Sequence, residues 1–245
     1  MTRKSILCFF LFFLLNLDIS YATSNNNIVE LNFLSSVSSQ ENPWKIIRFN
    51  DSIPPTIFNV RSWDNKVALE AIADSSMAVY SRTLSFDLKK TPYLCWYWRI
   101  DKSVEKAIMG SKSGDDYAAR IYVTFTNTQS SIFSLTKSTL LGLVGYQTPD
   151  VAIDYVWDNK NPINYQLFSP YVSQDSMIVV ESGDLKSHQW ILEKRNLLAD
   201  LQKSFGTSDF NISSIGFASD ADNTHSQAHA GFADVKFVNN PNLCH

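Results

Sequence analysis

Strict alternation of apolar and polar residues is the feature that most limits how this sequence folds. In the segment 119–125 every second residue is apolar, and Arg120, Tyr122 and Thr124 fill the positions between. Successive side chains of a β-strand point to opposite faces. This period of two therefore predicts a strand with one buried face and one face that carries an arginine and an aromatic ring. The same period recurs in the segments 94–100, 153–157 and 231–237.

The recurrence of such segments predicts an all-β fold. We expect about eight to ten short strands separated by turn residues, which is typical of an antiparallel β-sandwich of the jelly-roll type. Trp96 and Trp98 are expected in the core, because they alternate with Leu94 and Ile100. One shared face of the last strand is expected to hold Gly231, Ala233, Val235 and Phe237.

Two segments depart from this pattern and predict one or two short helices. Residues 197–205 carry apolar side chains at helical spacing, at 197, 198, 201 and 205, and Gly206 follows as a stop signal. Residues 132–144 are apolar on several sides, and we expect either a helix or a covered loop inserted between two strands.

The N-terminal residues predict export. Arg3 and Lys4 precede a continuous apolar block over 6–15, and Ser20 and Ala22 supply small residues before a cut after Ala22. This is the three-part pattern of a secretory signal peptide over 1–22, so we expect a periplasmic or secreted protein. The block is shorter than the roughly 20 residues of a membrane-spanning helix, and no span is expected in the mature chain.

The remaining chain is expected to form a flexible lead-in over 23–42, one β-sandwich domain over 43–238 and a polar tail over 239–245. The formal net charge is −3, and the basic residues do not cluster. Nucleic acid is therefore not expected as a partner. A disulfide between Cys95 and Cys244 is left open, and the favoured interpretation is a buried, unpaired Cys95.

Several motifs, taken in order, carry a family resemblance. They are Gly-Asp-Asp-Tyr-Ala-Ala-Arg-Ile-Tyr-Val (114–123), Tyr-Val-Trp (155–157), Val-Val-Glu-Ser-Gly (179–183), Arg195 with Asp200 and Phe205-Gly206, Asp-Ala-Asp-Asn-Thr (220–224) and Phe-Ala-Asp-Val (232–235). With these motifs the sequence resembles the bacterial exported family catalogued as domain of unknown function 3047. The resemblance implies a bacterial source and no established activity.

The chain ending shows a second, looser resemblance. Ile-x-x-Ile-x-Phe-x-x-Asp over 212–220, followed by Phe-x-Asp-Val-x-Phe over 232–237, is similar to the closing strands of jelly-roll carbohydrate-binding modules. This resemblance concerns the fold, and fold alone does not imply function.

A ligand-binding sheet face is the favoured functional hypothesis. Aromatic rings stack on sugar rings, while Arg and Asp side chains bind hydroxyls. The candidate residues, expected on one non-core face and in the loop that leads into it, are Tyr97, Arg99, Asp115, Asp116, Arg120, Tyr122 and Asp154. They predict an exported, non-catalytic module that binds a polysaccharide or glycan. The alternative is that the 132–144 or 197–205 segment covers this face and leaves Arg120 as a buried ion-paired residue.

Two other functions are kept open. A carbohydrate-active hydrolase would use Asp116 with Asp154 or Glu181, because that chemistry needs two carboxyl groups a fixed distance apart. Asp115 and Asp116 alternatively shape their loop, bonded to backbone amides or to Arg120. The other function is a structural or envelope-associated protein without a small ligand, whose partner is an envelope protein.

Oxygen ligands gather near the C-terminus. Asp220, Asp222 and Asn223, with Asp234 returning to the same place, predict a structural calcium site, and no other cofactor is expected. The alternative is an Asx-turn. His225 and His229 are spaced as in helical zinc sites, but they stand in a loop that enters a strand, which disfavours zinc.

Overall fold

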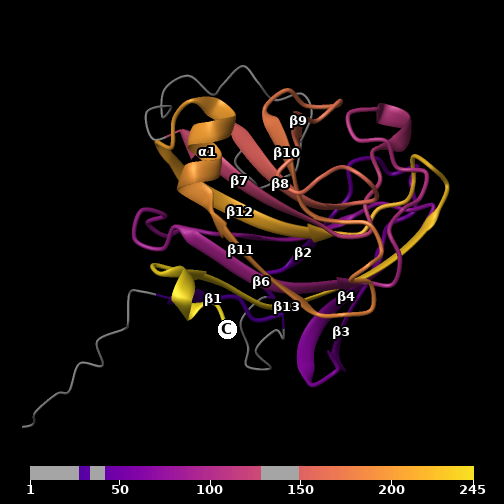
Figure 1. Cartoon of the computed structure of the whole chain (residues 1–245), viewed down its shortest axis with the longest axis horizontal. Helices are drawn as coiled ribbons and strands as arrows, with labels where there is room; N and C mark the ends of the chain where they lie inside the picture. Colours follow the sequence, from indigo (N-terminus) through magenta and orange to yellow (C-terminus); the bar gives the residue numbers. More distant parts are fainter. Residues whose placement is uncertain (1–27, 34–41, 128–148) are drawn as a thin grey trace, which may run out of the picture.

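Two β-sheets pack face to face in the computed structural model, which describes residues 28–33, 42–127 and 149–245 (Figure 1). The six-stranded sheet has the order β11-β6-β13-β4-β3, with β1 also paired to β13. Its strands are β1 (Ile28–Glu30), β3 (Ile57–Trp63), β4 (Lys66–Asp74), β6 (Tyr93–Ile100), β11 (Ile191–Asn196) and β13 (Gln227–Val238).

The seven-stranded sheet has the order β2-β5-β12-β7-β8-β10-β9. Its strands are β2 (Lys45–Ile47), β5 (Val79–Thr83), β7 (Arg120–Asn127), β8 (Val151–Asp158), β9 (Gln166–Phe168), β10 (Asp175–Ser182) and β12 (Phe210–Ala218). All neighbouring strands are antiparallel except β8 and β10, which run parallel. A parallel pair needs a long crossover, and residues 159–174 with β9 supply it. The predicted antiparallel sandwich is confirmed, with this one parallel pair added.

The core lies between the sheets and is rich in aromatic rings. Trp96 stacks on Tyr155 and Trp98 packs against Trp157, each at 5.5 Å between ring centroids, so β6 and β8 touch across the sandwich. All four side chains are buried. Full burial of a large apolar side chain contributes about 1.5–3 kcal/mol. The prediction that Trp96 and Trp98 belong to the core is confirmed.

A β-bulge overturns the face assignment in the last strand. The register of β13 against β6 shifts between Ala233 and Lys236, and Asp234 has a φ of 50°. One residue is therefore inserted, which turns the strand over. Val235 and Phe237 enter the core, whereas Gly231 lies on the outer face against two indole rings. The expected single face of Gly231, Ala233, Val235 and Phe237 is wrong for this reason.

The helix α1 (Leu197–Phe205) is confirmed with the predicted bounds. The Asn196 side chain accepts a hydrogen bond from the amide of Ala199 and caps its start, and Gly206 ends it in the left-handed region, at φ 75°. Leu197 and Leu201 are buried in the core. Short 3₁₀ turns lie before β7, at η1 (Lys112–Gly114), and after β13, at η3 (Pro241–Leu243). The second expected helix, over 132–144, lies outside the described residues.

The described part of the N-terminal region is built into the sandwich. Ile28–Glu30 form β1 against β13, and Leu31 and Phe33 are buried in the core. The expected flexible lead-in over 23–42 is therefore wrong for these residues, because their apolar side chains complete the core. The expected signal peptide over 1–22 lies outside the described residues. Among the residues that are described, no helix has the length and apolar character to cross a membrane.

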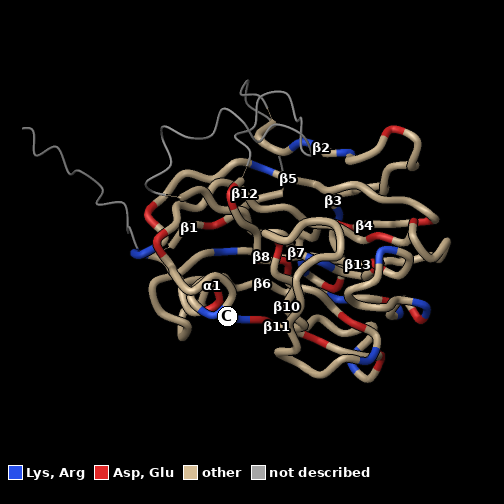
Figure 2. Tube along the Cα trace, turned by 90° about the horizontal axis from the view of Figure 1, so that it is seen from above, with Lys and Arg blue, Asp and Glu red and all other residues tan. Residues whose placement is uncertain are grey.

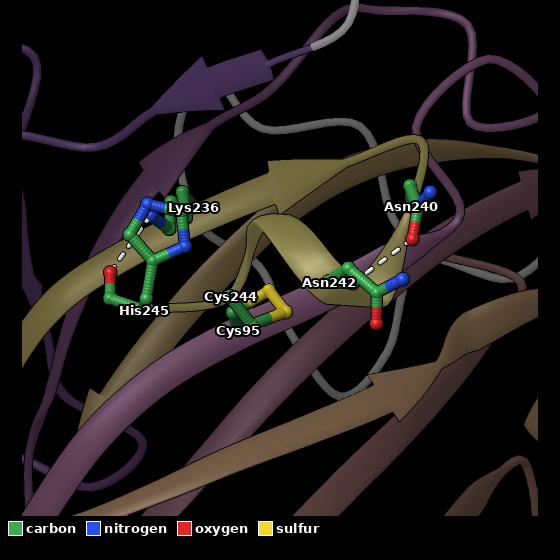
Figure 3. The surroundings of a disulfide bond; sticks show 6 residues. All are labelled: Cys95, Lys236, Asn240, Asn242, Cys244 and His245. Carbon is green, nitrogen blue, oxygen red and sulfur yellow. Dashed lines mark hydrogen bonds between the residues drawn. A yellow bond between two sulfur atoms is a disulfide. The ribbon is translucent and has the colours of Figure 1, made fainter.

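A disulfide fastens the C-terminal tail to the six-stranded sheet (Figure 3). Cys95 of β6 bonds Cys244, with 5.6 Å between their Cα atoms. The Lys236 ammonium donates to the carbonyl of His245, which holds the last residue beside β13 (Figure 3). The favoured interpretation of an unpaired Cys95 is wrong, because sequence does not give the distance between residues so far apart in the chain.

We expect Cys244→Ser to lower the free energy of unfolding by about 2–5 kcal/mol, because the bond closes a long loop and restricts the unfolded chain. Thermal unfolding with and without dithiothreitol measures this effect. Reductant should lower the Tm of the wild-type protein toward that of the variant and leave the Tm of the variant unchanged. A wild-type Tm that reductant does not move, under conditions that reduce the bond, contradicts the prediction.

Candidate functional site

The structure divides the predicted ligand-binding residues between two opposite outer faces. Tyr97 and Arg99 alternate with the core residues of β6 and therefore lie on the outer face of the six-stranded sheet. Arg120, Tyr122 and Asp154 lie on the outer side of the seven-stranded sheet. The expected common face is wrong, because alternation tells which side of a strand a residue occupies but not which sheet the strand joins.

Arg120 is a buried ion-pair centre, as the alternative interpretation held. Its Nε donates to Asp154 Oδ2 at 3.0 Å, its Nη2 also contacts that oxygen, and its Nη1 lies 2.7 Å from Asp220 Oδ2. The carboxylate of Asp115 lies 3.6 Å from the same Nη1. The guanidinium also lies 4.8 Å from the ring centroids of Tyr117 and Tyr122. These partners occupy the donors that a ligand would need.

The cover over this part of the sheet is the segment that precedes β7, and not helix α1. Met109 and Tyr117 pack on Val156, Met177 and Val179 from the outer side of β8 and β10. Helix α1 instead contributes to the core between the sheets. The residues 132–144, which were the other expected cover, lie outside the described residues.

Burial dominates the electrostatics of the Arg120 centre. It raises the pKa of Asp154 to about 6, although the charge of Arg120 acts in the opposite direction. Burial also raises the pKa values of Asp220 and Asp175 well above the ordinary range. Both effects follow from the cost of holding a carboxylate away from water.

Asp116 shapes its loop, as one alternative held. Its two oxygens accept hydrogen bonds from the backbone amides of Asn223 at 3.1 Å and Thr224 at 2.6 Å. These bonds join the Gly-Asp-Asp-Tyr loop to the turn after β12. They also bring Asp116 close to Asp220 and Asp222, and one oxygen from each carboxylate lies within 4.8 Å of the others.

Asp234 does not join this group. It lies at the bulge of β13, where Lys66 donates to its Oδ2 at 2.5 Å on the other sheet. The prediction that Asp234 is a calcium ligand is therefore wrong, because the bulge places Asp234 on the outer face of the six-stranded sheet. Among the other expected ligands, Asn223 donates from its side chain to Asp222 at 3.3 Å.

The carboxylate pairs expected for a hydrolase do not form a site. Asp116 and Asp154 are fully buried, which leaves no surface for a substrate. A bulge between Val179 and Glu181 places Glu181 in register with Trp157, whose ring is in the core. Glu181 therefore lies on the opposite face of the sheet from Asp154. Its Oε2 accepts from Lys186 at 2.6 Å.

Glu193 of β11 interacts electrostatically with Glu181. Its Oε1 accepts from the indole nitrogen of Trp98 at 3.2 Å. Burial, and then the charge of Glu181, raise the pKa of Glu193 to about 7, against the opposing effects of Trp98, Lys186 and Arg195. The core-facing side of β11, an edge strand of the six-stranded sheet, thus holds a carboxyl group whose pKa is raised to about 7.

The outer face of the six-stranded sheet carries an aromatic arrangement that sequence reasoning missed. We call Trp63, Trp190, Arg99 and His229 the tryptophan cluster. The Arg99 guanidinium lies 4.3 Å from the ring centroid of Trp63 and 5.7 Å from that of Trp190. The imidazole of His229 stacks on Trp63 at 5.0 Å, and Trp190 meets Trp63 edge-on at 5.8 Å. Both indoles are partly exposed.

Gly231 supplies the room for these rings. A Cβ atom at this position would lie 2.8 Å from the Trp190 ring and 3.0 Å from that of Trp63. The two indoles therefore rest directly on the backbone of β13. The turn Asp64-Asn65, with both residues at positive φ, places Trp63 at the end of β3 above that backbone. A lone tryptophan before an Asp-Asn turn was the signal available in the sequence.

Charged groups around the tryptophan cluster are paired with each other. Glu70 accepts from Arg61 at 2.8 Å and lies 3.1 Å from Nε2 of His229, whose Nδ1 is 2.6 Å from Asp101. Arg99 pairs with Asp64. Burial by itself would raise the pKa of Glu70, but the hydrogen bonds from Arg61, Asn59 and His229 outweigh it and lower this pKa. Lysine and arginine are interspersed with aspartate and glutamate along the described part of the trace (Figure 2).

Tyr97 extends this face along β6. The Lys66 ammonium lies 3.7 Å from the centroid of its ring, and Lys66 also binds Asp234. The outer face therefore offers aromatic rings beside an array of hydrogen-bonding groups, from Trp190 across to Tyr97. Of the predicted ligand residues, Tyr97 and Arg99 belong to it.

The fold and this face define an all-β sandwich protein with an aromatic and polar outer sheet. The family model described as "protein of unknown function (DUF3047)" matches residues 42–236, and the chain belongs to this family. The resemblance seen in the sequence is thereby confirmed. No curated protein matches the chain.

Solved structures show distant likeness. A family 11 carbohydrate-binding module from Clostridium thermocellum, in complex with a β-1,3-1,4-mixed-linked tetrasaccharide, is 10% identical with a TM-score of 0.40, covering 86% of this chain and 95% of that one. The xyloglucanase domain of NopAA from Sinorhizobium fredii is 10% identical with a TM-score of 0.36, covering 88% and 93%. An endo-1,4-β-glucanase, CelB2, has a TM-score of 0.31 at 10% identity, covering 87% and 90%.

We expect the protein to lose stability as the pH rises from about 4.5 to about 7, because in this range the unfolded chain releases the Glu193 proton while the folded chain still holds it. Its pKa is 4.5 in the unfolded chain and about 7 in the folded one, so only the folded state holds the proton between these values. The stabilisation is complete below the lower value and is lost above the higher one, on the order of 2 kcal/mol.

Thermal unfolding from about pH 5 to pH 8 measures this effect. Glu193→Gln should be more stable than the wild type at pH 8 and should show a smaller decrease in Tm over the range. Glu105→Gln, at an exposed site, is the matched control and should follow the wild type. Parallel wild-type and Glu193→Gln profiles would show that Glu193 does not titrate here.

Proposed function

We propose that this protein is an exported, non-catalytic module that binds a polysaccharide or glycan on the outer face of its six-stranded sheet. The observation that carries the proposal is the tryptophan cluster, in which Arg99 is held between Trp63 and Trp190 over Gly231. Indole rings offer flat apolar faces to the C–H groups of sugars, and polar tips at their edges. Carboxylates and guanidinium groups beside them bind hydroxyls and fix the orientation of the ligand.

The rigidity of the face supports this proposal. Arg99 is held by Asp64 and two indoles, and His229 is held by Asp101 and Glu70. Side chains that are already ordered lose little conformational entropy when a ligand binds. Carboxylate oxygens retain free lone pairs after one hydrogen bond, so Asp101, whose side chain has 42% of its surface exposed, can still accept from a sugar hydroxyl.

Export supports a glycan outside the cytoplasm as the ligand. The signal-peptide pattern over 1–22 directs the chain out of the cytoplasm. The Cys95–Cys244 disulfide suits an oxidising compartment. We therefore place the protein in the periplasm or outside the cell.

A structural or envelope-associated role is the second candidate, and exposed apolar residues favour it. Ile57 and Ile72 face each other across β3 and β4 on the same outer face, with 60% and 37% of their surface exposed. Neighbouring apolar side chains of this kind are typical of protein contacts. This role predicts a protein partner on β3 and no glycan affinity.

Trp63→Ala separates the two candidates. We expect it to weaken glycan binding at least about tenfold, because it removes the stacking surface, worth ~1.4 kcal/mol or more. Affinity electrophoresis in gels that contain soluble polysaccharides, followed by calorimetry on the positive ones, measures the effect. Tyr165→Ala is the matched control, since Tyr165 is an aromatic side chain with 39% of its surface exposed, outside the tryptophan cluster.

Three results would contradict the glycan proposal. One is an absence of binding to every polysaccharide tested, and another is an equal loss in the Trp63→Ala and Tyr165→Ala variants. The third is a wild-type protein that binds no glycan but binds a partner protein, with that binding abolished in the Ile57→Ser variant. This result would establish the second candidate instead.

A further inference from the structure

Buried carboxylates outnumber basic side chains on the outer side of the seven-stranded sheet, around Arg120. Around Arg120 stand Asp115, Asp116, Asp154, Asp175, Asp220 and Asp222, of which all but Asp222 are buried. Within the described ranges, Arg120 is the one lysine or arginine that forms an ion pair with any of them. A buried carboxylate without a partner is costly, so such a site takes up either protons or a cation.

Three of these carboxylates already have the spacing of a cation site. One oxygen each from Asp116, Asp220 and Asp222 lies within 4.8 Å of the other two. Oxygen ligands at about 2.3–2.6 Å from a calcium ion are at most about 5 Å apart, so one ion reaches all three. The hydrogen bonds from Asn223 and Thr224 to Asp116 fix its carboxylate in place and leave lone pairs for a metal.

Asp115 gives a second, independent observation at this place. It is buried, and its Oδ1 has no hydrogen-bond partner. Its other oxygen approaches the same Nη1 of Arg120 that binds Asp220. Because both carboxylates approach this one nitrogen, Asp115 lies beside Asp220, a member of the cluster. A cation next to Asp116, Asp220 and Asp222 would balance the negative charge of this buried oxygen.

The cluster has a route to solvent. Asp222 and Asn223 are partly exposed. Tyr171, with 47% of its surface exposed, donates from its hydroxyl to the carbonyl of Lys112 and borders Asn223. An ion can therefore enter past Asp222 without unfolding the loop.

We infer that Asp116, Asp220 and Asp222 bind one calcium ion beside Asp115. The donors are all oxygens, which suit hard cations, and this group contains no histidine or cysteine to favour zinc or copper. Calcium is preferred to magnesium because it accepts irregular sets of oxygen ligands from separate loops. The ion joins the Gly-Asp-Asp-Tyr loop to the turn after β12.

Thermal unfolding of the full chain in EGTA and in millimolar calcium chloride tests this inference. At about 100 times the dissociation constant, calcium should raise the wild-type Tm by roughly 5–10 °C. Asp222→Asn should weaken calcium binding at least about tenfold, because ligand charge sets the affinity. In EGTA this variant should be as stable as the wild type or more so, since it removes repulsion from Asp116.

Asp234→Asn is the matched control, because it removes a carboxylate that pairs with Lys66 on the other sheet. It should keep the wild-type increase in Tm with calcium. Trp63→Ala should keep it as well, so the outcome does not depend on the proposed glycan site.

Terbium luminescence tests the site without any variant. Terbium occupies calcium sites, and Tyr171 and Tyr117 are near enough to sensitise its emission; calcium should displace one bound ion per chain. A wild-type Tm that millimolar calcium leaves unchanged, with no sensitised emission, overturns the inference. So does an Asp222→Asn variant that folds and keeps the wild-type calcium affinity. If that variant does not fold, the wild-type titration alone decides.

Discussion

The contact of aromatic rings across the sandwich is the interaction on which the rest of the structure depends. Trp96 and Trp98 of β6 meet Tyr155 and Trp157 of β8, and no backbone hydrogen bond joins the two sheets at this place. Once these faces are buried, the pleat of each strand sends the alternate residues outward. Arg99 and Arg120, which both alternate with core residues of their strands, therefore end on opposite outer surfaces. The division of this protein into two distinct polar faces follows from that burial.

The two outer faces then develop differently because different segments lie against them. On the seven-stranded sheet, Met109 and Tyr117 cover β8 and β10, so the polar residues beneath them need partners within the chain. Arg120 provides one positive charge there, and its pairs with Asp154 and Asp220 are retained because breaking a buried pair is far more costly than its net contribution. On the six-stranded sheet, Trp63 and Trp190 rest on Gly231 and stay partly open to water. The polar residues of the first face are therefore covered and paired within the chain, whereas the aromatic rings of the second face remain accessible to solvent.

Local chemistry in the sequence was enough to predict some elements and not others. Helix α1 was predicted with its bounds because its signals, the apolar spacing and Gly206, lie within the helix and at its end. The buried faces of β6 and β7 were predicted because a period of two needs no knowledge of the partner strand. The buried face of β13 was not predicted correctly, since the bulge at Asp234 depends on how β13 pairs with β6. The disulfide and the division of the site between two sheets were missed for the same reason: both depend on distances between residues remote in the chain.

The most distinctive motif of the sequence has a different role from the one its composition suggests. The residues of Gly-Asp-Asp-Tyr-Ala-Ala-Arg supply the centre of a buried ion network, in which Asp116 holds the turn after β12 and Arg120 holds two strands and that turn together. A set of buried charges tolerates few substitutions, because each lost partner leaves another charge unpaired. The tryptophan cluster carries no such constraint: its indoles come from separate turns, need only the space above Gly231, and leave no sequence motif. The most conspicuous motif of the sequence therefore marks what holds the sandwich together, whereas the tryptophan cluster is visible only in the structure.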